Sequence, residues 1–210
     1  MKFRFGFIVL VLIMTASLIF FWSDIKTSNE KIIDNAAGTS VEDKKQTAPT
    51  VLAIDSSWGE MNAKTTIVQF SDFTCPYCRE AHAVLEAVMK QKRNIKIVWK
   101  DLPNDNHHPL STFLARAGRC AQKINKFKTF HDWTFANIAG LDESIVKAYL
   151  KNLGLPDAEA CLVDQSTIAK VERTIAEAVA LGIDGTPYLF INNQPYHGEI
   201  TVETMEKNIK

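Results

Sequence analysis

The sequence of 210 residues predicts an α/β domain in which a block of helices is inserted between the two halves of a small sheet. Two segments rich in β-branched and aromatic residues, 65–71 and 95–100, flank a segment with apolar residues at helical spacing. Helical patterns then fill about residues 105–181, after which strand-type sequence returns and a helix closes the chain. The length suits one sizeable domain, or one domain with an insertion.

We expect residues 1–22 to form a transmembrane anchor or a secretory signal rather than part of the domain. Lys2 and Arg4 precede an uncharged apolar run of 17 residues, 6–22. That length is close to the minimum for a helix that spans a bilayer, and a charged start before an apolar run is also typical of a cleaved signal. The sequence favours the uncleaved anchor, because the small residues Thr15, Ala16 and Ser17 are followed by further apolar residues.

This anchor predicts where the rest of the chain lies. Positive charges before a membrane segment stay in the cytoplasm, which places the domain at the periplasmic or another extracytoplasmic face. The alternative is a protein secreted after signal cleavage. Residues 23–50 are polar, with small residues and mixed charges, so we expect a flexible linker. The domain then covers residues 51–210, in an oxidising compartment where disulfides persist.

The first half of the domain predicts a strand–helix–strand unit. Residues 65–71 form a strand, residues 80–92 a helix with an apolar stripe, and residues 95–100 a second strand. This order indicates a parallel pair joined by a right-handed crossover.

The helical block and the closing half follow. Apolar stripes occur in residues 111–124, 128–139, 144–154, 157–163 and 166–182. Gly140 and Gly154 fit helix ends, and Pro156 with Asp157 fits a new helix start. Residues 186–191 and 194–197 predict two strands around an Asn-Asn turn, and residues 201–210 a final helix.

Composition excludes some functional classes. The chain has 24 Lys and Arg against 24 Asp and Glu, so its formal net charge is zero. A nucleic-acid partner is not expected, because such proteins usually carry a basic excess. No phosphate-binding glycine loop and no internal repeat is present.

The stretch FTCPYCRE contains Cys75 and Cys78, one helical turn apart. Cys75 lies where a strand ends and a helix begins, and Pro76 falls at the first helical position, where its missing N–H costs nothing. A cysteine that caps a helix faces unpaired N–H groups and the positive end of the helix dipole, which lowers its pKa. The pattern favours a redox pair. A purely structural disulfide is the alternative that these residues leave open.

A metal site is not expected. A structural zinc site usually has four ligands, often in two cysteine pairs, whereas Cys120 and Cys161 are single and His107 and His108 are adjacent. We therefore predict no metal and no cofactor besides the Cys75–Cys78 pair.

The stretch VQFSDFTCPYC resembles the first strand and active-site helix of exported DsbA-like thiol oxidoreductases, which have the thioredoxin fold with an inserted helical subdomain. VWKDLP, the helical stretch from HPLSTF to HDWTF, and GIDGTPYLFINNQPYHG are similar to the rest of that family, so the resemblance covers about residues 55–210. The resemblance makes Cys75 the attacking cysteine, Cys78 the resolving cysteine and Thr186-Pro187 a cis-proline loop.

The resemblance also implies substrate contacts and a second disulfide. Pro76, Tyr77, Thr186 and Pro187 are expected to bind substrate, with the Thr186 backbone pairing with an extended segment. A turn before a strand is the alternative for Thr186-Pro187. Some members of the family carry a further disulfide in the helical block, which we expect between Cys120 and Cys161; two buried free thiols are the alternative.

The resemblance implies an enzyme that forms disulfides in exported, cysteine-containing proteins and is re-oxidised by a membrane partner, and the predicted anchor at residues 1–22 tethers it to the membrane. The Pro-Tyr dipeptide between the cysteines also occurs in glutaredoxins, so the direction of thiol exchange stays open. The alternatives are a reductase or isomerase on the same fold, or a copper-binding thiol chaperone. No dimerisation segment is visible, so we expect a monomer.

Residues around the pair are weaker candidates. Asp72 fits the family pattern and is a candidate to influence a cysteine pKa, with a simple turn residue equally open. Lys100 and Asp101 end the second strand and are candidates for the border of the site. Several residues are expected to pack in the core or lie at the surface rather than bind ligand: Trp99, Trp133, Phe127, Phe130, Phe135, His82, His131 and His197.

Overall fold

The computed structural model describes residues 46–209. The predicted anchor at residues 1–22 and most of the predicted linker at residues 23–50 lie outside the described residues. Within the described part, no helix is long and apolar enough to span a membrane. The last predicted linker residue, Thr50, donates its backbone N–H to the Glu177 carboxylate over 2.6 Å.

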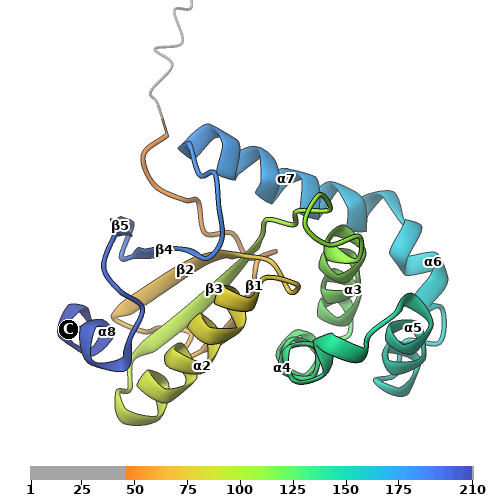
Figure 1. Cartoon of the computed structure of the whole chain (residues 1–210), viewed down its shortest axis with the longest axis horizontal. Helices are drawn as coiled ribbons and strands as arrows, with labels where there is room; N and C mark the ends of the chain where they lie inside the picture. Colours follow the sequence, from red (N-terminus) through yellow and green to blue (C-terminus); the bar gives the residue numbers. More distant parts are fainter. Residues whose placement is uncertain (1–45, 210) are drawn as a thin grey trace, which may run out of the picture. The chain divides into compact units, whose positions relative to one another are not determined.

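Five strands form one mixed sheet in the order β1-β3-β2-β4-β5 (Figure 1). They are β1 (Ser56–Gly59), β2 (Thr65–Ser71), β3 (Ile95–Asp101), β4 (Tyr188–Ile191) and β5 (Gln194–Tyr196). β2 and β3 run parallel, as the strand–helix–strand pattern predicts, and α2 (Pro76–Gln91) connects them. The other pairs are antiparallel.

The sheet has a core on each face, which explains the nearly continuous apolar sequence of its central strands. On one face, α2 and the C-terminal helix α8 (Val202–Asn208) pack through Leu85, Val88 and Met205 against Ile67 and Ile97. On the other face, Ala178 of α7 (Gln165–Leu181) packs among residues of β2, β3 and β4: Val68, Phe70, Val98 and Phe190.

The edge strand β1 is the element that the sequence analysis missed. It pairs antiparallel with β3, Ser56 opposite Trp99 and Gly59 opposite Lys96. Four residues with a single large apolar side chain carry no usable periodicity, so the strand exists because β3 offers it an open edge. Gly59 has φ +92°, and a Cβ there would lie 2.3 Å from the Ile95 carbonyl oxygen, so the position requires glycine.

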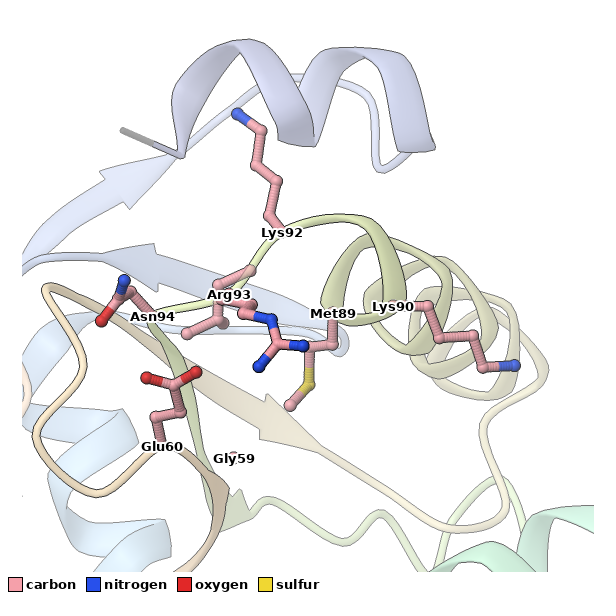
Figure 2. A pocket seen from close by; sticks show the side chains of 8 residues that line it. Gly59, Glu60, Met89, Lys90, Lys92, Arg93 and Asn94 are labelled. Carbon is pink, nitrogen blue, oxygen red and sulfur yellow. The ribbon is translucent and has the colours of Figure 1, made fainter.

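Gly59 also lines a hollow at the C-terminal end of α2, shown in Figure 2. Lys92 points from this end of α2 toward α8, and its ammonium donates to the backbone carbonyls of Glu206 and Ile209. Cations near a helix C-terminus stabilise its free carbonyls. This contact fixes α8 against α2, at the end opposite to Cys75.

The helical insertion lies between β3 and β4, as predicted. It consists of α3 (Ser111–Lys123), α4 (Phe127–Asn137), the 3₁₀ turn η1 (Ile138–Gly140), α5 (Glu143–Asn152), α6 (Ala158–Val163) and α7. Its core, which includes Leu114, Phe130 and Leu150, continues without a break to Phe73, Cys78 and Trp99 of the sheet unit. The insertion is therefore packed directly behind the cysteine pair.

Candidate active site

The turn between β2 and α2 sets the position of Cys75. The Asp72 carboxylate accepts from the Thr74 N–H over 2.8 Å and from the Thr74 hydroxyl over 2.9 Å. The Cys75 N–H donates to the Asp72 carbonyl. Cys75 is then the N-cap of α2 with extended backbone angles, and Pro76 occupies the first turn, as the sequence predicts.

The environment of the Cys75 sulfur favours its anion. The Cys78 N–H donates to Cys75 Sγ over 3.3 Å, which favours the thiolate. The Thr186 carbonyl oxygen, 3.5 Å from Sγ, accepts instead from the protonated thiol. The hydrogen bond with the Cys78 thiol is the main cause that lowers the pKa of Cys75 to about 6, and the Cys78 and Tyr77 backbone groups add to it. Near pH 7 the partly exposed Cys75 is therefore mainly a thiolate, the nucleophilic form.

Cys78 has the opposite properties. Its side chain is fully buried, and it is a free thiol like Cys75. Burial raises the pKa of Cys78 far above its ordinary value, and the adjacent Cys75 sulfur raises it further. One thiol is thus partly exposed and acidic while its partner is buried and protonated, which suits Cys75 to attack and Cys78 to resolve a mixed disulfide.

The loop before β4 approaches the pair from the other side. Its Thr186–Pro187 peptide bond is cis, as the resemblance implies, and the Thr186 carbonyl faces Cys75. Pro76, Tyr77 and Thr186 line a pocket of about 440 Å³ together with Cys75, whereas Pro187 is not among its lining residues. Tyr77 is 67% exposed, so its ring is available to a partner.

The comparisons with known proteins agree with this arrangement. Residues 54–210 match the family described as Thioredoxin. The chain belongs to the thioredoxin family. The matched residues of this thioredoxin-family chain include the cysteine pair at the start of α2, where both cysteines are free thiols.

Solved structures share the fold of this thioredoxin-family chain. The catalytic domain of Proteus mirabilis ScsC is 21% identical and has a TM-score of 0.65, covering 75% of this chain and 88% of that one. BdbD from Bacillus subtilis is 18% identical with a TM-score of 0.65, and the match covers 77% of this chain and 94% of BdbD. Pseudomonas aeruginosa DsbA2 is 24% identical with a TM-score of 0.62, and the match covers 76% of this chain and 94% of DsbA2. The thioredoxin fold that the resemblance implies is confirmed.

The curated relatives are longer proteins. The Na(+)/H(+) antiporter NhaA 1 of Salinispora arenicola is 28% identical over 149 residues, which are 70% of this chain and 23% of the antiporter. The antiporter NhaA of Herminiimonas arsenicoxydans is 30% identical over 156 residues, which are 72% of this chain and 24% of that antiporter. The chain spans about a quarter of the length of these relatives.

The sequence analysis missed part of the pocket in this thioredoxin-family domain. Asn104, His107 and His108, from the segment after β3, and Asp184, before Thr186, also line it. In the sequence, the two adjacent histidines stand out only as possible zinc ligands. Because β2 and β3 are parallel, their carboxyl ends meet at one edge, and this rule could have placed the segment after β3 beside Cys75.

Lys100 and Asp101, the candidates for the border of the site, do not line the pocket. Lys100 is fully buried and forms ion pairs of 2.8 Å with Asp55 and with Glu177. Asp101 is buried and paired with Arg119 of α3 over 2.5 Å. These pairs connect the sheet to α3 and α7, so their role is to hold the insertion in place.

Asp72 also has a structural role. Besides its bonds to Thr74, its second carboxylate oxygen accepts from the Asn104 N–H over 3.0 Å. The Thr74 hydroxyl in turn lies 2.7 Å from that of Ser111, at the start of α3. Asp72 therefore fixes both the cysteine turn and the segment that follows β3.

The other two cysteines form a disulfide between α3 and α6. Cys120 and Cys161 are 41 residues apart in sequence, their Cα atoms are 5.9 Å apart, and both side chains are buried. The bond closes a loop that contains α4 and α5. Its burial separates it from substrates, so it is a structural element of the insertion.

Proposed function

We propose that this protein is a membrane-tethered, extracytoplasmic thiol oxidant that transfers the Cys75–Cys78 disulfide to exported proteins. The single observation that supports it best is the contrast between the two sulfurs: Cys75 is partly exposed at the helix start and accepts from the Cys78 N–H, which favours its thiolate, while Cys78 is fully buried, which favours its thiol. Stabilising one thiolate favours the reduced enzyme, and a favoured reduced form makes the disulfide oxidising.

The proposed reaction has two exchange steps. A substrate thiolate attacks Cys75 Sγ of the enzyme disulfide, the Cys75–Cys78 bond breaks, and Cys78 leaves and takes a proton. A second substrate thiolate attacks the substrate sulfur of the mixed disulfide, and Cys75 leaves as a thiolate. Two electrons pass from substrate to enzyme, and of the two substrate protons one ends on Cys78 and one in solvent. A leaving thiol of low pKa makes the second step fast.

The cis-proline loop is the proposed docking edge for the substrate. Proline at 187 carries no N–H, while the Thr186 carbonyl lies beside the reacting sulfur. An extended substrate segment next to Thr186 would place its cysteine at Cys75 in the manner of an added strand. The exposed Tyr77 ring and Pro76 provide an apolar contact on the other side of the sulfur.

The location follows from the N-terminal sequence. Lys2 and Arg4 before the apolar run at residues 6–22 support an anchor with its domain outside the cytoplasm. A similar structure from Salmonella enterica serovar Typhimurium, 20% identical, is described as a periplasmic thioredoxin-like protein. The proposed partners are cysteine-containing exported proteins and a membrane partner that restores the disulfide, with the protein acting as a monomer.

The reduction potential of the Cys75–Cys78 pair tests the direction. In glutathione buffers we expect a value between about −180 mV and about −120 mV, the potentials of protein disulfide isomerase and DsbA. A value near that of thioredoxin, about −270 mV, would reject the oxidant and support a reductase.

Two variants test the roles of the cysteines. Cys75→Ser should abolish exchange. Cys78→Ser should accumulate mixed disulfides with a disulfide-containing substrate, because its Cys75 thiolate attacks that disulfide, releases one substrate thiolate, and has no neighbouring thiol to resolve the product. Turnover retained by Cys75→Ser would overturn the assignment. Tight stoichiometric Cu(I) binding without thiol oxidation would instead support the copper chaperone.

A further inference from the structure

Three side chains suited to metal binding meet between α2 and α4, outside the redox pair. His82 comes from α2, and His131 and Asp132 come from α4. Among the described residues 46–209 they form the one group of three or more His, Cys, Asp or Glu whose ligand atoms all lie within 4.8 Å of one another. No metal is predicted from the sequence, in which His82 and His131 are expected only to pack in the core or to lie at the surface.

The distances within this cluster match a small divalent cation. His82 Nε2 lies 3.4 Å from Asp132 Oδ1, and His131 Nδ1 lies 3.1 Å from the same oxygen. Zinc binds imidazole nitrogen and carboxylate oxygen at about 2.0–2.1 Å, so tetrahedral ligands lie about 3.3–3.4 Å apart. Both imidazole nitrogens are therefore already at ligand spacing from Asp132 Oδ1, and all three ligand atoms lie within 4.8 Å of one another.

Aromatic packing fixes the two imidazoles. The buried His131 ring lies 4.8 Å from the Trp99 ring and 4.9 Å from the Phe135 ring, and the His82 ring stacks on Phe135 at 5.4 Å. Ligands held by packing lose little freedom when an ion binds. The side chain of Asp132 is 45% exposed, which leaves an entry path and room for water at a further coordination position.

The surrounding charges leave one carboxylate oxygen available. Lys128 lies 2.6 Å from Asp132 Oδ2 and 3.1 Å from Glu86 Oε1. It thus holds Asp132 by the oxygen that faces away from the imidazoles. Two carboxylates and one ammonium give this cluster a net negative charge, although the ammonium itself repels a cation.

We propose that His82, His131 and Asp132 bind one zinc ion, with water completing its coordination. Imidazole and carboxylate ligands with an open position suit Zn²⁺. The ion would join the helix that carries both redox cysteines to the insertion, since His82 lies one turn after Cys78 on α2. This site is independent of the direction of thiol exchange.

The test is a calorimetric titration of the full chain with zinc chloride. The chain is kept in detergent, carries no histidine tag, and has Cys75 and Cys78 oxidised so that thiolates cannot bind the ion. We expect one zinc per chain and a higher melting temperature with zinc than without it. His82→Gln and Asp132→Asn should each weaken binding at least about tenfold. The exposed His197→Gln is the matched control and should bind like the wild type.

A gain-of-affinity variant keeps the proposal testable if a ligand variant does not fold. Lys128→Gln removes the positive charge beside Asp132 and should tighten zinc binding severalfold. No zinc binding by the oxidised wild type, wild-type affinity in His82→Gln, or unchanged or weaker binding in Lys128→Gln would each overturn the site.

Discussion

Removing the Cys78 thiol should raise the pKa of Cys75. The hydrogen bond with that thiol is the main cause of the low Cys75 pKa, about 6. Cys78→Ala removes it but keeps the Cys78 N–H, which is 3.3 Å from the sulfur. A hydrogen bond to a charged group contributes about 1.5–3 kcal/mol, or about 1–2 pKa units. Because Cys75 is partly exposed, solvent replaces part of this stabilisation of the thiolate, and we expect the pKa of Cys75 to rise by about one unit.

This change alters the thiolate population near neutrality. A group with a pKa of about 6 is roughly nine-tenths ionised at pH 7, whereas a free cysteine of pKa about 8.5 is only about 3% ionised. In Cys78→Ala the thiolate fraction at pH 7 should fall to roughly one half. The rate of alkylation at pH 7 should fall in the same proportion, because the thiolate is the reacting form.

The assay is the pH dependence of thiolate ultraviolet absorbance and of iodoacetamide alkylation in the reduced protein, with mass spectrometry to identify the modified cysteine. Wild type should react at Cys75 alone, because Cys78 is buried and protonated. Cys75→Ala is the control and should lose the acidic titration step. A wild-type midpoint near that of free cysteine refutes the thiolate argument, and an identical midpoint in Cys78→Ala refutes the role of the Cys78 thiol.

Three further predictions concern stability. The pKa of Cys75 is about 6 in the folded, reduced protein and lower than in the unfolded chain. The thiolate therefore stabilises the reduced form fully above the unfolded pKa, and this contribution is lost as the pH falls through 6. Urea unfolding of both redox forms should show a relative gain for the reduced form of about 1 kcal/mol at pH 7 compared with pH 5, after allowance for solvent screening; no change with pH would contradict it. Lys100→Met should cost about 3 kcal/mol in urea unfolding, because it removes the ammonium that pairs with the buried Glu177 and leaves Asp55 paired with Arg173 alone. A loss below about 1 kcal/mol would show that this network is dispensable. The double variant Cys120→Ala, Cys161→Ala should lose about 4 kcal/mol on the chain-entropy argument for a 41-residue separation, yet keep its exchange rate, and a folded variant without exchange would contradict a structural role.

The features that sequence predicted well are those with local causes. Pro76 directly after Cys75 indicates a helix start, because proline suits the first helical turn and few other helical positions. The parallel pair β2 and β3 follows from two buried strands around one helical pattern. Thr186-Pro187 was assigned through its order relative to the helical block and through the resemblance, and its cis bond is present.

The features that sequence did not predict depend on distant partners. Lys100 follows directly from a buried strand, so its position suggested the site border, but its charge is neutralised by Asp55 and Glu177 from elsewhere in the chain. His82 and His131 were expected only to pack or to lie at the surface. Their rings meet 4.5 Å apart because α4 packs near α2, and no spacing rule within either helix contains that information.

The difference between the two cysteines arises from the same helix start, and it limits what the motif can determine. Any strand followed by Cys-Pro-x-Cys at a helix start places the first sulfur at the helix end and the second one turn inside, so an acidic Cys75 and a protonated Cys78 follow from geometry. The strength of the oxidant depends on further contacts to Cys75. The Thr186 carbonyl is 111 residues away in sequence and 3.5 Å from the sulfur. A substitution in that loop should therefore change the reduction potential without altering the motif, and this explains why the cysteine stretch alone leaves the direction of exchange open.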